Sequence, residues 1–192
     1  MTLFTRLTQM PLMAHGAATA VTFGAFLAVK NKLDALYAAS RHPVDYATGQ
    51  TTFDAERIKG FYAHMQQLET LDVYIQTQQF DFLFILCVAA LGLTLGTLVA
   101  RMSAPGTWGR RLGFAAAGLA LAGATMDALE NLTSFVMLAD PQGFALWLAL
   151  PYSGFAAIKF ALLALAMLEV VLSAVAGGLS RLVALVKPAS RR

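Results

Sequence analysis

Apolar residues fall into four long runs separated by more polar stretches, and this pattern predicts the architecture. The runs cover residues about 11–29, 80–100, 112–138 and 153–177. A helix needs about 20 predominantly apolar residues to cross the hydrocarbon core of a bilayer. We therefore predict an all-α integral membrane protein, with residues 1–192 forming one membrane domain built as a four-transmembrane-helix bundle.

The long polar segment 30–79 lies between the first two spans. A turn-rich loop occupies 42–49, and after Asp54 apolar residues recur at helical spacing as far as Ile75. No proline interrupts the chain between Asp54 and Arg101. This pattern predicts a long helix that begins outside the bilayer and runs straight into the second span as its extramembrane extension.

Two shorter segments complete the predicted layout. The apolar segment 141–151 is too short to span and is bounded by prolines, so we expect it at the interface with Trp147 as an anchor. The tail 178–192 is basic and is expected to lie on the membrane surface. Gly92 and Gly96 form a GxxxG pair, which favours close helix packing. A cleaved signal peptide is an alternative reading of the first run.

Composition and charge agree with a membrane protein. Hydrophobic residues make up 58% of the chain and charged residues 13%, whereas charged residues are about 25% of a typical soluble domain. Positive charges gather at Arg6, in the loop 101–111 and in the tail, while 139–152 has none. The positive-inside rule then predicts a bacterial inner-membrane protein with both termini cytoplasmic and segments 30–79 and 141–151 extracytoplasmic.

Asp127, Glu130 and Asn131 interrupt the third apolar run. Their spacing places them on one face of a helix. At about 1.5 Å per residue, Asp127 lies roughly 22 Å from the start of this span, in its outer half. Asp81 at the start of the second span and Lys159 near the start of the fourth fall at a comparable height. We therefore predict that these five residues form one polar cluster.

The cluster has two readings. Ionisable residues at membrane depth usually mark a functional site, but a buried network can also serve only to fix helix packing. Three carboxyl groups against one lysine favour binding of a proton or a cation. Matching depth also suggests a second, inner pair of His15 and Glu169, although a lone histidine on a small-residue face is commonly a hydrogen-bonded packing residue.

The sequence lacks the residue motifs of several common metal sites, enzymes and nucleic-acid-binding proteins. Asp127-x-x-Glu130 has none of the histidines of a di-metal bundle, and the single Cys87 allows no disulfide or cysteine metal site within one chain. No Ser-His-Asp, P-loop or HExxH arrangement appears, and no basic stripe indicates nucleic acid. We predict no metal and no cofactor.

The functional hypothesis is a membrane protein whose cluster binds a lipid, a small hydrophobic ligand or a cation, or one that serves as a subunit of a membrane complex or homo-oligomer. The alternative is a membrane enzyme or proton-coupled carrier that acts on a hydrophobic substrate through carboxylate and lysine acid–base chemistry. The first hypothesis requires no catalytic motif and is preferred.

A resemblance supports the same layout. Asp81 before an apolar span, the block Asp-Ala-Leu-Glu-Asn at 127–131 and Lys159 in the fourth span follow an outer segment with Phe53-Asp54-x-x-Arg57. This arrangement resembles a group of small, uncharacterised bacterial four-span membrane proteins. The resemblance extends loosely over the whole chain, implies the four-span layout and the same polar residues, and implies no activity.

Overall fold

A computed structural model describes residues 2–186 and contains four long helices. They are α2 (Leu12–Ser40), α5 (Leu71–Ala100), α6 (Trp108–Leu138) and α7 (Ala149–Val186). By length and composition, four helices are apolar enough to cross a membrane, and the described residues contain no strand. The predicted all-α, four-span architecture is confirmed.

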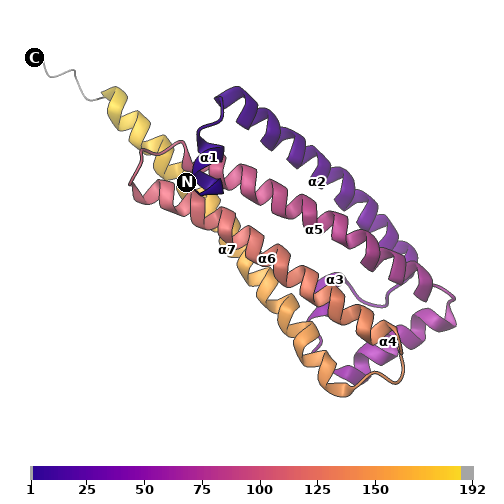
Figure 1. Ribbon diagram of the computed structural model, residues 1–192. Coiled ribbons are helices and arrows are strands. Elements are labelled where there is room, and N and C mark those ends of the chain that lie inside the picture. Colours follow the sequence, from indigo (N-terminus) through magenta and orange to yellow (C-terminus); the bar gives the residue numbers. More distant parts are fainter. Residues whose placement is uncertain (1, 187–192) are drawn as a thin grey trace, which may run out of the picture.

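The four long helices form an open row. α2 packs on α5, α5 on α6 and α6 on α7, whereas α2 and α7 are not among the pairs in extensive contact within residues 2–186 (Figure 1). α1 (Leu3–Thr8) and the C-terminal end of α7 lie at one end of the row, and α3 (Tyr46–Gln50) and α4 (Ala55–Gln67) lie at the other (Figure 1). Which end is cytoplasmic stays a prediction.

The second span has a short helical extension before residue 80, as predicted, but this helix does not continue without a break from Asp54, so the prediction of one uninterrupted helix is wrong. α4 ends at Gln67, α5 begins at Leu71, and Glu69 between them has a left-handed backbone with φ 56°. The break folds α4 back so that Tyr62 and Met65 are buried in the core at this end. A straight extension would leave that apolar face in water.

Short elements complete the fold and shift two predicted boundaries. α1 (Leu3–Thr8) precedes the first span, and η1 (Leu146–Leu148) leads directly into α7. Pro151 therefore lies in the first turn of α7, where its missing N–H would have no helical partner in any case. α7 also extends through the predicted tail to Val186, and the remaining basic residues of that tail lie outside the described residues.

The cap, by which we mean α3, α4 and η1 with their loops, contains a half-buried histidine. His42 packs against the rings of Tyr37, Phe61 and Tyr74 at centroid distances of 5.3, 5.1 and 5.4 Å. Burial lowers the pKa of His42, opposed by its hydrogen bond to Val44. The folded cap therefore favours the neutral imidazole.

We expect the cap to loosen on acidification because the unfolded state gains a proton on His42 more readily than the folded state. Its stabilisation is full above about pH 6.5 and is lost as the pH falls through the folded pKa. Amide hydrogen exchange in α4, compared between about pH 7 and about pH 5, measures this loss. A His42→Gln variant should lack the pH dependence, and a His64→Gln variant should retain it; equal behaviour of the two variants would contradict the assignment.

Candidate functional site

Close packing of α5 against α6 sets the position of the polar residues. A side chain at Gly96 would place its Cβ 2.8 Å from the Ala117 amide nitrogen, and one at Gly113 would lie 2.6 Å from the Ala100 nitrogen. Only glycine permits this approach at both positions. On the other side of α6, Ser173 of α7 donates a hydrogen bond to the Gly109 carbonyl at 2.7 Å. These contacts align three helices along their length.

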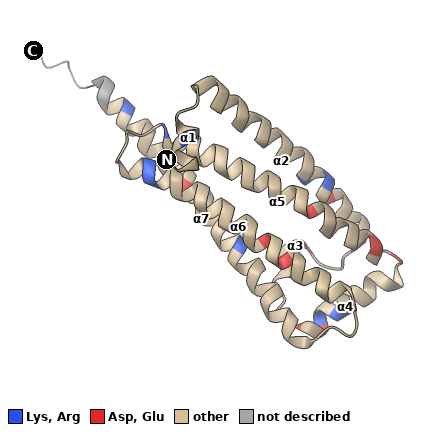
Figure 2. Ribbon diagram, viewed as in Figure 1, with Lys and Arg blue, Asp and Glu red and all other residues tan. Residues whose placement is uncertain are grey.

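The alignment brings the five predicted cluster residues into two neighbouring sets of contacts, both of which include residues of α6. The Lys159 ammonium pairs with the Asp127 carboxylate at 2.6 Å and also with Glu130. The Asn131 amide donates to Asp81 Oδ2 at 2.6 Å. All five are buried, with exposures between 0% and 8%. Figure 2 shows the charged members as a small group part-way along α5, α6 and α7.

Gln78 also belongs to this network, although sequence reasoning missed it. Its amide donates to Ser134 Oγ at 2.9 Å and makes a longer contact of 3.4 Å with Asn131 Oδ1. The sequence feature that could have predicted this role is the position of Gln78, three residues before Asp81 and therefore on the same helical face. Gln78 ties the amide of Asn131 to α5 from a second side.

Glu130 has one oxygen that the network leaves unsatisfied. Its Oε2 meets Lys159, but its Oε1 is buried without a hydrogen-bond partner among the described residues. Together with Asp81 and Asp127, Glu130 makes three carboxyl groups in a cluster that contains one lysine, and that lysine pairs with Asp127 and Glu130. A cluster of this composition can bind a proton, or it can accept a hydrogen bond from a further donor group.

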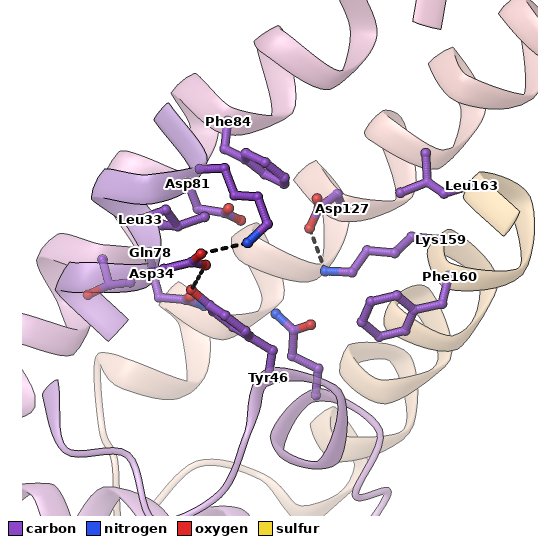
Figure 3. A pocket seen from close by; sticks show the side chains of 13 residues that line it. Leu33, Asp34, Tyr46, Gln78, Asp81, Phe84, Asp127, Lys159, Phe160 and Leu163 are labelled. Carbon is purple, nitrogen blue, oxygen red and sulfur yellow. Dashed lines mark hydrogen bonds and ion pairs between the residues drawn. The ribbon is translucent and has the colours of Figure 1, made fainter. Parts of the chain in front are cut away.

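A cavity of about 250 Å³ reaches this cluster. Figure 3 shows Asp81 and Phe84 of α5, Asp127 of α6 and Lys159 of α7 converging on it. Leu33, Phe160 and Leu163 add apolar surface. The cavity is therefore amphipathic, with ionisable groups and hydrocarbon on the same wall.

The cap side of the cavity comes from segments that sequence reasoning did not assign to a site. Lys30 and Asp34 of α2 form an ion pair of 2.5 Å, and Tyr46 of α3 donates to Asp34 Oδ1 at 3.2 Å. Gln50 lies beside them on the wall. These residues looked like ordinary surface polar positions, and only the return of α3 across the end of α2 places them at the cavity.

The suggested pair of His15 and Glu169 does not form. His15 Nε2 lies 3.0 Å from the Thr94 carbonyl oxygen and 3.1 Å from Thr97 Oγ1, while Arg101 lies 3.3 Å from its Nδ1. His15 thus faces α5, whereas Glu169 lies on α7 at the far side of the row. Their depths agree, but helix order separates them.

Glu169 has its own unsatisfied atom. Its Oε2 is buried without a hydrogen-bond partner among residues 2–186.

No group of three histidine, cysteine, aspartate or glutamate side chains among residues 2–186 is arranged to hold a metal ion. The cavity is therefore the best-supported candidate site.

The resemblance to small bacterial four-span proteins rests on the motif residues alone and stays a prediction. The cluster geometry is consistent with their joint importance, because the motif positions 81, 127, 130, 131 and 159 meet in space. No family model, curated protein or solved structure matches this chain.

Proposed function

We propose that this protein binds a small amphiphilic molecule, such as a lipid or a hydrophobic metabolite, in the cavity between α2, α3, α5, α6 and α7. It does so in the bacterial inner membrane, with its termini on the cytoplasmic side. The single observation that carries the proposal is the cavity itself, because its wall combines buried charged groups with apolar rings and side chains.

The two kinds of surface suit two parts of one ligand. The polar head lies against Asp81, Asp127 and Lys159, where hydrogen-bond donors and acceptors are concentrated. The apolar part lies against Phe84, Phe160 and Leu163. Ligand sites commonly combine mostly apolar walls with a few convergent polar groups that fix orientation.

The open row of helices supports access from the bilayer. α2 and α7 form opposite walls of the cavity, and they are the two outermost helices of the row (Figure 1). Because α2 and α7 are not extensively packed against each other, we infer that this side of the cavity opens toward lipid once the protein is inserted. An amphiphile dissolved in the membrane can therefore enter sideways without crossing the cap.

The volume of the cavity limits the size of the ligand that it can hold. Small-molecule sites span roughly 300–1,000 Å³, and this cavity has about 250 Å³. A space of this size suits a head group with a few attached carbons, and we infer that a longer chain would extend from the cavity toward the bilayer.

A proton-coupled carrier is the second candidate, and one observation favours it. Glu130 Oε1 is buried without a partner next to the Lys159 ion pairs, so the cluster can accept a proton as the ligand leaves. Ligand-driven pH change inside liposomes that contain the protein would distinguish transport from binding alone.

A cavity-filling variant tests the proposed function. Leu163→Trp places an indole in the cavity and should abolish saturable binding of amphiphilic probes, whereas Leu165→Trp should not, because Leu165 on the same helix is 49% exposed to the lipid side. Dodecylamine, dodecanol and dodecanoate serve as probes, measured by titration calorimetry on protein in nanodiscs. Native mass spectrometry should also find less co-extracted small molecule on the Leu163→Trp protein.

Failure of all three probes to bind the wild-type protein would refute the proposed function. Equal binding to the two tryptophan variants would place any bound probe outside the cavity. Both variants must show wild-type helical content and wild-type elution on gel filtration.

A further inference from the structure

We propose that the cavity is selective for a positively charged organic head group, that is, an amphiphilic ammonium compound. This inference rests on the proposed function and names the chemical class of its ligand. It follows from which charges around the cavity are already paired, from the free oxygen of Asp81 and from the rings beside it.

The cations on the cavity wall are already engaged. Lys30 pairs with Asp34, and Lys159 pairs with both Asp127 and Glu130. Asp81 has no cation partner among the described residues. A ligand that enters the cavity therefore meets one carboxyl group that no ion pair engages.

Asp81 offers an acceptor to the cavity. It is 8% exposed and lines the cavity, and its Oδ2 accepts the amide hydrogen bond from Asn131. Its Oδ1 takes part in no hydrogen bond within residues 2–186. Because a buried carboxylate needs charge compensation and filled acceptor positions, an ammonium N–H at this oxygen supplies both.

Aromatic rings favour the same class of head group. Phe84 follows Asp81 by three residues, so the ring and the carboxyl group share one face of α5, and both line the cavity (Figure 3). Phe160 carries a cation in the structure already, since Lys159 Nζ lies 5.2 Å from its ring centroid. Ring faces attract alkylammonium groups through cation–π interactions.

Other ligand charges fit less well. An anionic head group that approached Lys159 would come within reach of Asp81 and Asp127, which line the same space, and like charges repel. A metal cation lacks a ligand set, because no three suitable side chains among the described residues are close enough to hold one. The apolar walls further favour a cation that carries hydrocarbon.

The choice between matched probes tests the inference. Dodecylamine, dodecanol and dodecanoate share one chain and differ in head-group charge. We expect wild-type protein in nanodiscs to bind dodecylamine at least about tenfold more tightly than dodecanol, as for a charge-assisted hydrogen bond, and to bind dodecanoate most weakly. Competition by methylammonium, which has the head group without the chain, should be weak.

Asp81→Asn tests the residue that carries the inference. It should reduce dodecylamine binding by about tenfold or more while dodecanol binding stays close to wild type. Asp72→Asn is the matched control, because Asp72 lies on the same helix and is exposed. Thermal unfolding of both variants checks folding, and the wild-type probe order tests the inference without any variant.

The outcomes separate the two proposals. If dodecanol binds in a manner sensitive to Leu163→Trp and dodecylamine binds no better, the cavity binds amphiphiles and the charge selectivity is refuted. An unchanged preference in Asp81→Asn, or competition by methylammonium as strong as that by dodecylamine, also overturns the inference. Absence of binding by every probe refutes the proposed function and this inference with it.

Discussion

Replacement of Lys159 by methionine is expected to lower the free energy of unfolding by about 3–5 kcal/mol, the range for breaking a buried ion pair on one side. Lys159 compensates two carboxylates that are almost inaccessible, since Asp127 is 5% and Glu130 0% exposed. Methionine has a similar length but no charge, so it leaves both groups without a cation. Denaturant-induced unfolding in detergent, followed by circular dichroism, measures the loss.

Neutralising the partners should restore the stability. A protein with Lys159→Met, Asp127→Asn and Glu130→Gln together carries no buried charge at this position, and such replacements of whole ion pairs are often neutral or stabilising. Lys32→Met controls for loss of a lysine at an exposed position of α2. If Lys159→Met unfolds like Lys32→Met, the ion pairs do not stabilise the fold.

The rescued protein also distinguishes packing from function. A cluster that serves only to hold helices together leaves a triple variant that is folded and binds the probes as wild type does. A cluster that belongs to the ligand site leaves a folded protein with altered probe binding, because Asp127 and Lys159 line the cavity. The stability and binding measurements on one variant therefore answer different questions.

Gly113→Ala is expected to destabilise the protein by about 1–3 kcal/mol, the usual cost of overpacking. The added Cβ would lie 2.6 Å from both the nitrogen and the Cα of Ala100. These are backbone atoms, so a side-chain rotation cannot relieve the clash and α5 must move away from α6. We expect the same movement to weaken probe binding, because the cavity is built across these helices.

Gly118→Ala is the matched control on the same helix. A Cβ at Gly118 meets no atom within 4 Å, and alanine replaces glycine inside a helix with a gain of roughly 0.5–1 kcal/mol. Thermal unfolding should therefore move in opposite directions for the two variants. A Gly113→Ala protein as stable as Gly118→Ala would show that α5 and α6 do not approach as closely as described.

Local pattern was enough to predict much of the candidate site. Asp127, Glu130 and Asn131 share a face because helical spacing requires it, and Lys159 and Asp81 match their depth because an apolar span has a defined length. In the structure Lys159 pairs with Asp127 and Glu130, and Asn131 bonds to Asp81. The contact predicted between His15 and Glu169 from their similar depth does not form, because depth does not say which helices are neighbours.

Contacts between distant segments escaped prediction for a similar reason. No local sequence signal ends the helix at Gln67. The break stabilises the fold because it allows Tyr62 and Met65 to be buried against the ends of other helices. Lys30, Asp34 and Tyr46 reach the cavity wall only because α3 folds back there.

The sequence by itself determined that this is an all-α membrane protein with four spans and a group of carboxyl, amide and ammonium side chains at one depth, because hydrophobic length and helical periodicity are local properties. Only the tertiary structure decided that the helices stand in an open row, that α2 and α3 wall a cavity at the cluster and that His15 faces α5. Helix order and rotation depend on close packing between residues far apart in the chain, at positions such as Gly113 and Ala100.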